Sequence, residues 1–143
     1  MKSFSAGGIV FNKKGEVLLV VQRGPSISFP KGGINPGEEH EVAARREILE
    51  ESGVSELKLV SDLGTYVRPN MFVPDEIKEI HMFLFTTDEF DLKPTDPHNP
   101  EAMWVSRDEV VGRLSSKIDG EFFEEKILKT EVGLELSGEN TRR

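Results

Sequence analysis

The chain contains no cysteine and no long run of apolar residues. Without cysteine it has no disulfide, no cysteine-ligated zinc site and no thiol nucleophile. No segment is apolar over the length that a membrane span or a signal peptide requires, including the mixed segment at residues 1–4. These absences favour a cytoplasmic protein that has no membrane partner.

A net positive charge is also missing. The 143 residues carry a formal net charge of −8, whereas proteins that bind nucleic acid non-specifically are usually basic. The composition therefore argues against binding of duplex nucleic acid. With 36% hydrophobic and 31% charged residues, the chain fits one globular domain that is large enough to bury a core. If such an acidic protein acts on an anionic substrate, local positive charge or a metal ion must offset the repulsion.

Strand-like segments alternate with fewer helical ones along the chain. The expected strands are 3–11, 17–22, 57–67, 78–86 and 102–105, and the expected helices are 39–52, 107–114 and 121–130. Residues 24–37 and 88–100 are rich in loop formers. This order predicts an α/β fold in which a mixed β-sheet lies between helices. We expect a single domain over residues 1–136 and a flexible tail at 137–143.

The helix expected at 39–52 carries a concentrated acidic face. On a helical wheel, Glu47, Glu50 and Glu51 fall within an arc of about 100°. The opposite side is apolar and is expected to pack on the sheet; it consists of Val42, Ala44, Ile48 and Leu49. Clustered carboxylates destabilise a helix by repulsion, and no lysine relieves them between residues 42 and 51. They suit a hard divalent cation, although a solvated acidic face would give the same pattern.

The residues before and within this helix resemble the Nudix box. From Gly32 the chain has five residues, Glu38, seven residues, Arg46-Glu47-Ile48, one residue, Glu50-Glu51, one residue, and Gly53-Val54. All the defining positions match, which would happen by chance on the order of once in 10⁹ starts. The resemblance covers residues 32–54. It implies a Nudix-type α/β/α sandwich and a hydrolase that uses a divalent metal.

The same resemblance implies roles for the residues of the motif. It implies a magnesium site, at which Mn²⁺ can substitute, formed by Gly32, Glu47, Glu50 and Glu51. Glu47 either binds the metal or takes the proton from the attacking water. Glu38 pairs with Arg46, and this pair orients the catalytic carboxylates, Glu50 among them.

Residues that contact the substrate are expected beside the box and on the strands that follow it. The candidates are Arg23, Lys31, Gly33, Tyr66, Arg68 and Glu101. Arginine and lysine there can bind phosphates, with ordinary surface charge as the alternative. Tyr66 or the nearby Phe72 could stack a base, or could belong to the core. Glu101 precedes a tryptophan-containing segment, and a glutamate at that place is functional in some members of the family.

The resemblance implies hydrolysis of a phosphoanhydride bond in a small-molecule nucleotide or other diphosphate, by a monomer or a homodimer. Pro30-Lys31-Gly32 resembles the loop of members that act on dinucleoside polyphosphates. These compounds and nucleoside triphosphates are therefore favoured, while inositol pyrophosphates and RNA 5′-triphosphate ends stay open.

Two other functions are weighed against hydrolysis. A non-catalytic nucleotide-binding module on the same fold would usually lack box carboxylates, which this chain retains. Isomerases of isoprenoid diphosphates that resemble this family use a cysteine, and the chain has none. The histidines His40, His81 and His98 show no metal-ligand spacing, so no role is assigned to them.

Overall fold

A seven-stranded mixed sheet organises the computed structural model, which describes residues 1–22, 26–70, 72–95 and 101–130. The strands are β1 Lys2–Phe11, β2 Glu16–Gln22, β3 Ser26–Ser28, β4 Lys31–Gly33, β5 Lys58–Pro69, β6 Ile77–Thr86 and β7 Glu101–Ser106. Their order is β3-β2-β1-β6-β5, with β4 paired to β1 and β7 paired to β2. Only the β1–β6 pairing is parallel among these strands. The predicted mixed sheet is therefore confirmed.

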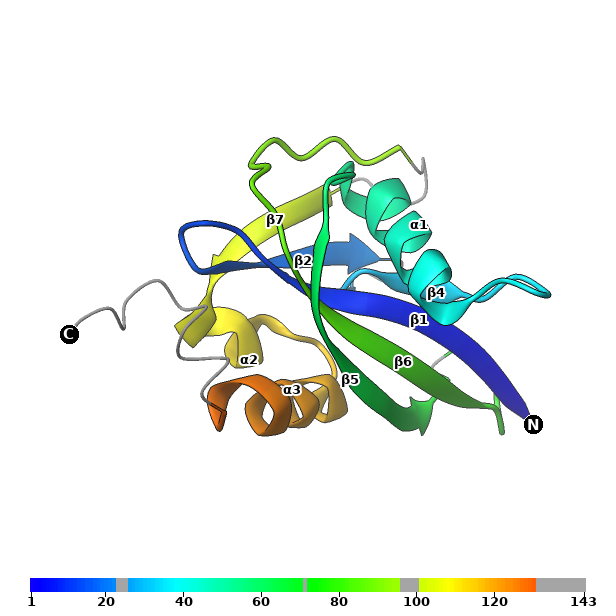
Figure 1. Ribbon diagram of the computed structural model, residues 1–143. Coiled ribbons are helices and arrows are strands. Elements are labelled where there is room, and N and C mark those ends of the chain that lie inside the picture. Colours follow the sequence, from blue (N-terminus) through cyan, green and yellow to red (C-terminus); the bar gives the residue numbers. More distant parts are fainter. Residues whose placement is uncertain (23–25, 71, 96–100, 131–143) are drawn as a thin grey trace.

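Helices cover both faces of this sheet. They are α1 His40–Ser52, η1 Arg107–Glu109, α2 Val110–Arg113, α3 Lys117–Phe123 and a π-helical continuation, η2 Glu124–Leu128. Figure 1 shows α1 on one face of the sheet and α2 and α3 on the other. The α/β/α sandwich expected from the sequence is thus confirmed. Within the described residues, no helix combines the length and the apolarity needed to cross a membrane.

The alternation of side chains along β1 explains the two cores. Successive residues of a strand point to opposite faces, so Val10 packs under α1 whereas Ile9 and Phe11 pack under α2 and α3. The core on the α1 side contains Ala6, Leu18, Ala43, Ala44, Ile48, Phe83 and Phe85. Because residues 5–11 of β1 are buried, the part of the strand at residues 6–11 contains no polar side chain and does not alternate between polar and apolar residues.

The elements differ from the sequence prediction mainly in short segments. The expected loop 24–37 includes the short strands β3 and β4, which pair with β2 and β1. The last helix begins at Lys117, four residues earlier than predicted, because the Ser116 hydroxyl accepts a hydrogen bond from the Asp119 amide. A serine followed three residues later by an acidic residue is a recognised start signal for a helix. The predicted tail 137–143 lies outside the described residues.

The packing face predicted for α1 is partly wrong. Val42 and Leu49 are 51% and 40% exposed, whereas Glu51 is only 4% exposed. The buried side of the helix consists of Ala43, Ala44, Ile48, Glu51 and Ser52. Close contact with β1 explains this rotation, because a Cβ at Gly8 would overlap the Ile48 side chain. One glutamate of the acidic arc is therefore turned inward.

Candidate active site

Strand β4 and helix α1 bring Gly32 directly against the side chain of Glu47. A Cβ added at Gly32 would overlap the Glu47 carboxylate, whereas a Cβ at the neighbouring Gly33 would meet nothing within 4 Å. The absence of a side chain at residue 32 therefore lets the carboxylate lie on the backbone of the loop.

Glu51 lies beside Glu47 in the interior of the site. Its Oε1 accepts hydrogen bonds from the Lys31 amide and from Nε2 of Gln22, each at 3.2 Å. Burial, followed by the charge of Glu47, raises the pKa of Glu51 to about 8. Burial also raises the pKa of Glu47, and the charge of Glu50 adds to this effect. Burial and the repulsion between neighbouring carboxylates thus both oppose ionisation of Glu47 and Glu51.

Arg46 holds this acidic group in place. Its guanidinium donates to both carboxylate oxygens of Glu38 at 2.9 Å, to the Gly33 carbonyl at 2.9 Å and to Glu47 at 2.7 Å. The contact with Glu50 is longer, at 3.5 Å. Hydrogen bonds from Arg46 and from the Asn35 amide hold the pKa of Glu38 at about 2. The predicted contact between Glu38 and Arg46 is therefore confirmed, and it also includes the loop backbone.

The donor set fits a divalent cation. Glu47 lies against Gly32, Glu51 accepts from the neighbouring Lys31 amide, and Glu50 shares the Arg46 guanidinium with Glu47. The site therefore offers the carboxylate oxygens that a hard divalent cation prefers. Among the described residues, no three Asp, Glu or His side chains converge on one point. Arg46 instead contacts both Glu47 and Glu50.

The raised pKa of Glu51 predicts a pH-dependent stability. Glu51 ionises near 4.5 when unfolded and at about 8 when folded, so between these values the folded protein binds the extra proton. The free energy of unfolding should therefore fall as pH rises through this window, in buffer with a chelator, and Glu51→Gln should make that fall smaller. Urea unfolding at several pH values measures the difference between the two proteins. Parallel pH profiles for wild type and variant would contradict the assignment.

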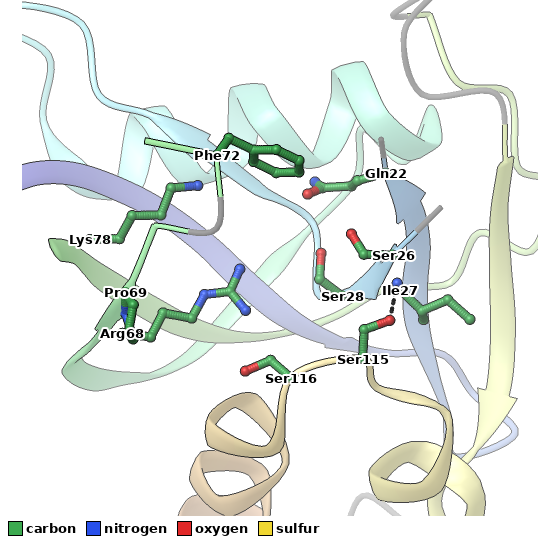
Figure 2. A pocket seen from close by; sticks show the side chains of 10 residues that line it. All are labelled: Gln22, Ser26, Ile27, Ser28, Arg68, Pro69, Phe72, Lys78, Ser115 and Ser116. Atoms are coloured by element: carbon green, nitrogen blue, oxygen red, sulfur yellow. Dashed lines mark hydrogen bonds between the residues drawn. The ribbon is translucent and has the colours of Figure 1, made fainter. Parts of the chain in front are cut away.

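A pocket adjoins the carboxylates of Glu47 and Glu51 (Figure 2). Gln22 connects the two regions, because it lines the pocket and donates to Glu51. Its volume is about 150 Å³. Its lining residues come from β2, β3, β5, β6 and the segments after β5 and before α3; they are Gln22, Ser26, Ile27, Ser28, Arg68, Pro69, Phe72, Lys78, Ser115 and Ser116. Figure 2 shows Arg68 and Lys78 extending towards the pocket from the end opposite Gln22. The pocket thus brings the charge of Lys78 within electrostatic range of Glu51.

Three cationic residues influence one another in this region. Lys31 is only 4% exposed, and burial together with the charges of Arg68 and Lys78 lowers its pKa to about 8. Burial and the charge of Arg68 also lower the pKa of Lys78. Arg68 donates to the buried Asp119 at 3.0 Å, while its buried Nε has no partner among the described residues. Burial and repulsion between like charges thus lower the pKa of both lysines, as they raise the pKa of Glu47 and Glu51.

Two of the other predicted substrate contacts, Tyr66 and Glu101, do not line this pocket. The ring of Tyr66 stacks on Phe122 at 4.3 Å and its hydroxyl donates to Asp119 at 2.6 Å, so this aromatic ring packs in the interior. Glu101 is exposed on β7, where it pairs with Val21. Arg23 lies outside the described residues. The sequence did not indicate that Gln22, Lys78 and Asp119 lie at or near the site. Of these three, only Asp119 belongs to a recognisable sequence pattern, and that pattern marks the start of a helix.

Comparisons with known proteins agree with this geometry. The family model described as NUDIX domain matches residues 1–130. Over 67 residues the chain is 39% identical to the RNA pyrophosphohydrolase of Proteus mirabilis, a match that spans 45% of this chain and only 38% of that relative.

Two solved structures share the fold over most of the chain. The binary complex of the Caenorhabditis elegans Ap4A hydrolase superposes with a TM-score of 0.75 and 20% identity, over 86% of this chain and 93% of that one. The Escherichia coli dihydroneopterin triphosphate pyrophosphohydrolase also gives 0.75, with 15% identity over 89% and 96% of the two chains.

Proposed function

The chain belongs to the Nudix family, and from this premise we propose that it is a magnesium-dependent pyrophosphohydrolase. Its substrate would be a nucleoside diphosphate linked to another group, cut at the phosphoanhydride bond. The observation that carries the proposal is a pair of neighbouring carboxylates: Glu47 lies against Gly32 and accepts from Arg46, and the buried Glu51 accepts from the Lys31 amide. A structural role alone would not require two undercompensated carboxylates beside a cationic pocket.

Each residue of the site has a separate proposed role in the reaction. Magnesium bound by Glu50, Glu51 and the Gly32 carbonyl would neutralise substrate charge and lower the pKa of the attacking water. Glu47, whose pKa is raised by burial, is suited to accept the proton of that water. Arg46 keeps Glu47 in position, and Glu38 keeps Arg46 in position.

The substrate that suits the neighbouring pocket carries several phosphates. Arg68 and Lys78 line the pocket and supply positive charge there, and a chain of phosphates is the part of a nucleotide that would satisfy it. Dinucleoside polyphosphates and nucleoside triphosphates are therefore the preferred candidates. The partner is a small molecule in the cytoplasm, and the active unit is a monomer or a homodimer.

A panel of substrates tests the proposed function. Purified protein with Mg²⁺ is incubated with dinucleoside polyphosphates, nucleoside triphosphates, ADP-ribose, inositol pyrophosphates and 5′-triphosphate RNA, and the products are identified by chromatography. We expect cleavage of at least one compound and its complete loss after chelation. Tight nucleotide binding without any cleavage would instead identify a non-catalytic binding module.

Arg46→Ala tests the positioning role of the arginine. The substitution frees Glu38 and Glu47 from their shared donor, so we expect the turnover rate to fall by about 10–100-fold. Metal affinity is measured in parallel by calorimetry. The control is Arg45→Ala, because Arg45 pairs with Glu41 at 2.9 Å on the same helix and does not contact the acidic group. Equal rates for the two variants would mean that the contacts of Arg46 with Glu38 and Glu47 do not support catalysis.

Lys78→Gln tests the contribution of the pocket to substrate binding. Loss of a charge-assisted contact worth about 1.5–3 kcal/mol should raise KM by roughly 10–100-fold while kcat changes little. Lys58→Gln on the exposed side of β5 is the matched control. An unchanged KM for Lys78→Gln at low and high salt would place the polyphosphate elsewhere.

A further inference from the structure

Two histidines that are far apart in sequence meet on the α1 side of the sheet. Nδ1 of His40, the first residue of α1, lies 2.8 Å from Nδ1 of His81 on β6. On the other side of the His81 ring, Nε2 lies 2.7 Å from the Asp62 carboxylate of β5. Three separate elements therefore meet in one chain of polar contacts, outside the acidic group and the pocket described above.

The tautomer of His81 follows from its neighbour. A carboxylate can only accept a hydrogen bond, so Nε2 of His81 carries a proton that it donates to Asp62. In the neutral ring, the lone pair then lies on Nδ1 and faces His40. The ring of His81 also stacks on Phe83 at 4.3 Å, which restricts its rotation. His81 is thus a preoriented nitrogen donor with a carboxylate behind it, an arrangement typical of histidines that bind metals.

We propose that His40 and His81 together bind a zinc ion through their Nδ1 atoms, with Asp62 orienting His81. Neutral imidazole nitrogen is a preferred ligand of Zn²⁺, whereas Mg²⁺ prefers oxygen, so this site and the carboxylate site select different ions. Zinc–nitrogen distances of about 2.0–2.1 Å place two tetrahedral ligands about 3.3 Å apart, so the rings must separate by roughly half an ångström. Without zinc, His40 donates its Nδ1 proton to His81, so zinc binding requires His40 to change to its Nε2–H tautomer. Solvent removes the proton from Nδ1 and returns one to Nε2, so the number of bound protons does not change.

The site has only two protein ligands among the described residues, where no third His, Asp or Glu side chain converges with them. Water would complete the coordination, so the ion is exchangeable rather than permanently enclosed. His40 is exposed, which leaves room for those waters. A bound ion would join the first turn of α1 to β6, and through Asp62 to β5. Because α1 also carries Glu47, Glu50 and Glu51, zinc would strengthen the attachment of the catalytic helix to the sheet.

Zinc titration of the full chain in the presence of excess Mg²⁺ tests this proposal, since Mg²⁺ competes for the carboxylates. The histidine ring nitrogens are followed by ¹⁵N NMR, and the affinity is measured by calorimetry. We expect the Nδ1 signals of His40 and His81 to shift with one equivalent of zinc, while those of His98 stay in place. His40→Gln and His81→Gln should each weaken zinc binding at least about 10-fold, and Asp62→Asn about 10–100-fold.

His98→Gln is the matched control and should bind zinc like the wild type. The His40→Gln variant keeps the test decisive if His81→Gln folds poorly, because His40 is exposed at the start of its helix. Unchanged affinity in His40→Gln, or zinc signals that arise only when Mg²⁺ is omitted, would overturn the proposal and leave an ordinary hydrogen bond. Neither result would depend on whether the protein hydrolyses nucleotides.

Discussion

Replacing Glu47 with glutamine is expected to lower kcat by roughly 10²–10⁴-fold, the usual contribution of a general base. Glutamine preserves the shape of the side chain but has no basic carboxylate. Glu47 combines the features that a base requires here: it is mostly buried, its pKa is raised by that burial, and Arg46 fixes one of its oxygens at 2.7 Å. KM should change little, because the other carboxylates and the cationic pocket remain.

Single-turnover rates and metal titrations of Glu47→Gln are to be measured together. Glu41→Gln is the matched control, since Glu41 pairs with Arg45 on the same helix and lies outside the acidic group. A large loss of metal affinity would show that Glu47 acts mainly as a ligand. A normal rate in Glu47→Gln would exclude it as the base and direct attention to Glu101 or to the acidic residues at 75–79.

Gly32→Ala is expected to reduce kcat/KM by about 100-fold, because a displacement of about 1 Å in an active site can have an effect of this size. The added Cβ would occupy the volume of the Glu47 carboxylate, which must then leave its contact with Arg46. The same methyl group at Gly33 meets nothing within 4 Å, so Gly33→Ala should keep most of the activity. The two substitutions are chemically identical and differ by one residue in position.

Thermal unfolding of both glycine variants separates misfolding from misplacement. Both variants should fold, because the Glu47 side chain is partly exposed and can rotate outwards when a methyl group is added at Gly32. Gly32→Ala should be the less stable variant, because that rotation breaks the contact of Glu47 with Arg46. Similar activity of the two variants would mean that Glu47 need not lie against the loop. A double variant, Gly32→Ala with Glu47→Gln, should be little worse than Glu47→Gln alone, because both changes act on one side chain.

Much of the active site could be predicted because it is local in sequence. Gly32, Glu38, Arg46 and the three box glutamates occupy one loop and one helix, so their spacing alone brings them together. The order of strands and helices likewise indicated a mixed sheet between helices. The contact of Arg46 with Glu38 follows from the same short range, because the two residues are only eight positions apart, one on the turn before the helix and one on the helix.

The rotation of α1 and the contacts between distant parts of the chain could be known only from the tertiary structure. No spacing in the sequence indicates that these residues meet. The rotation of α1 on β1 decides that Glu51 is buried and Leu49 exposed, and it depends on the small side chains where these elements touch. The link from Gln22 to Glu51 spans 29 residues, and the one from Arg68 to Asp119 spans 51.

The histidine pair shows the same division most clearly. His40 and His81 are 41 residues apart and show no metal-ligand spacing, yet the docking of α1 beside β6 places their nitrogens 2.8 Å apart. The sequence by itself determined the family, the sandwich and the acidic helix, because these depend on periodicity and on short spacings. Only the tertiary structure decided which carboxylates are buried, which cations meet them and which histidines touch, because sheet pairing and helix docking bring distant parts of the chain together.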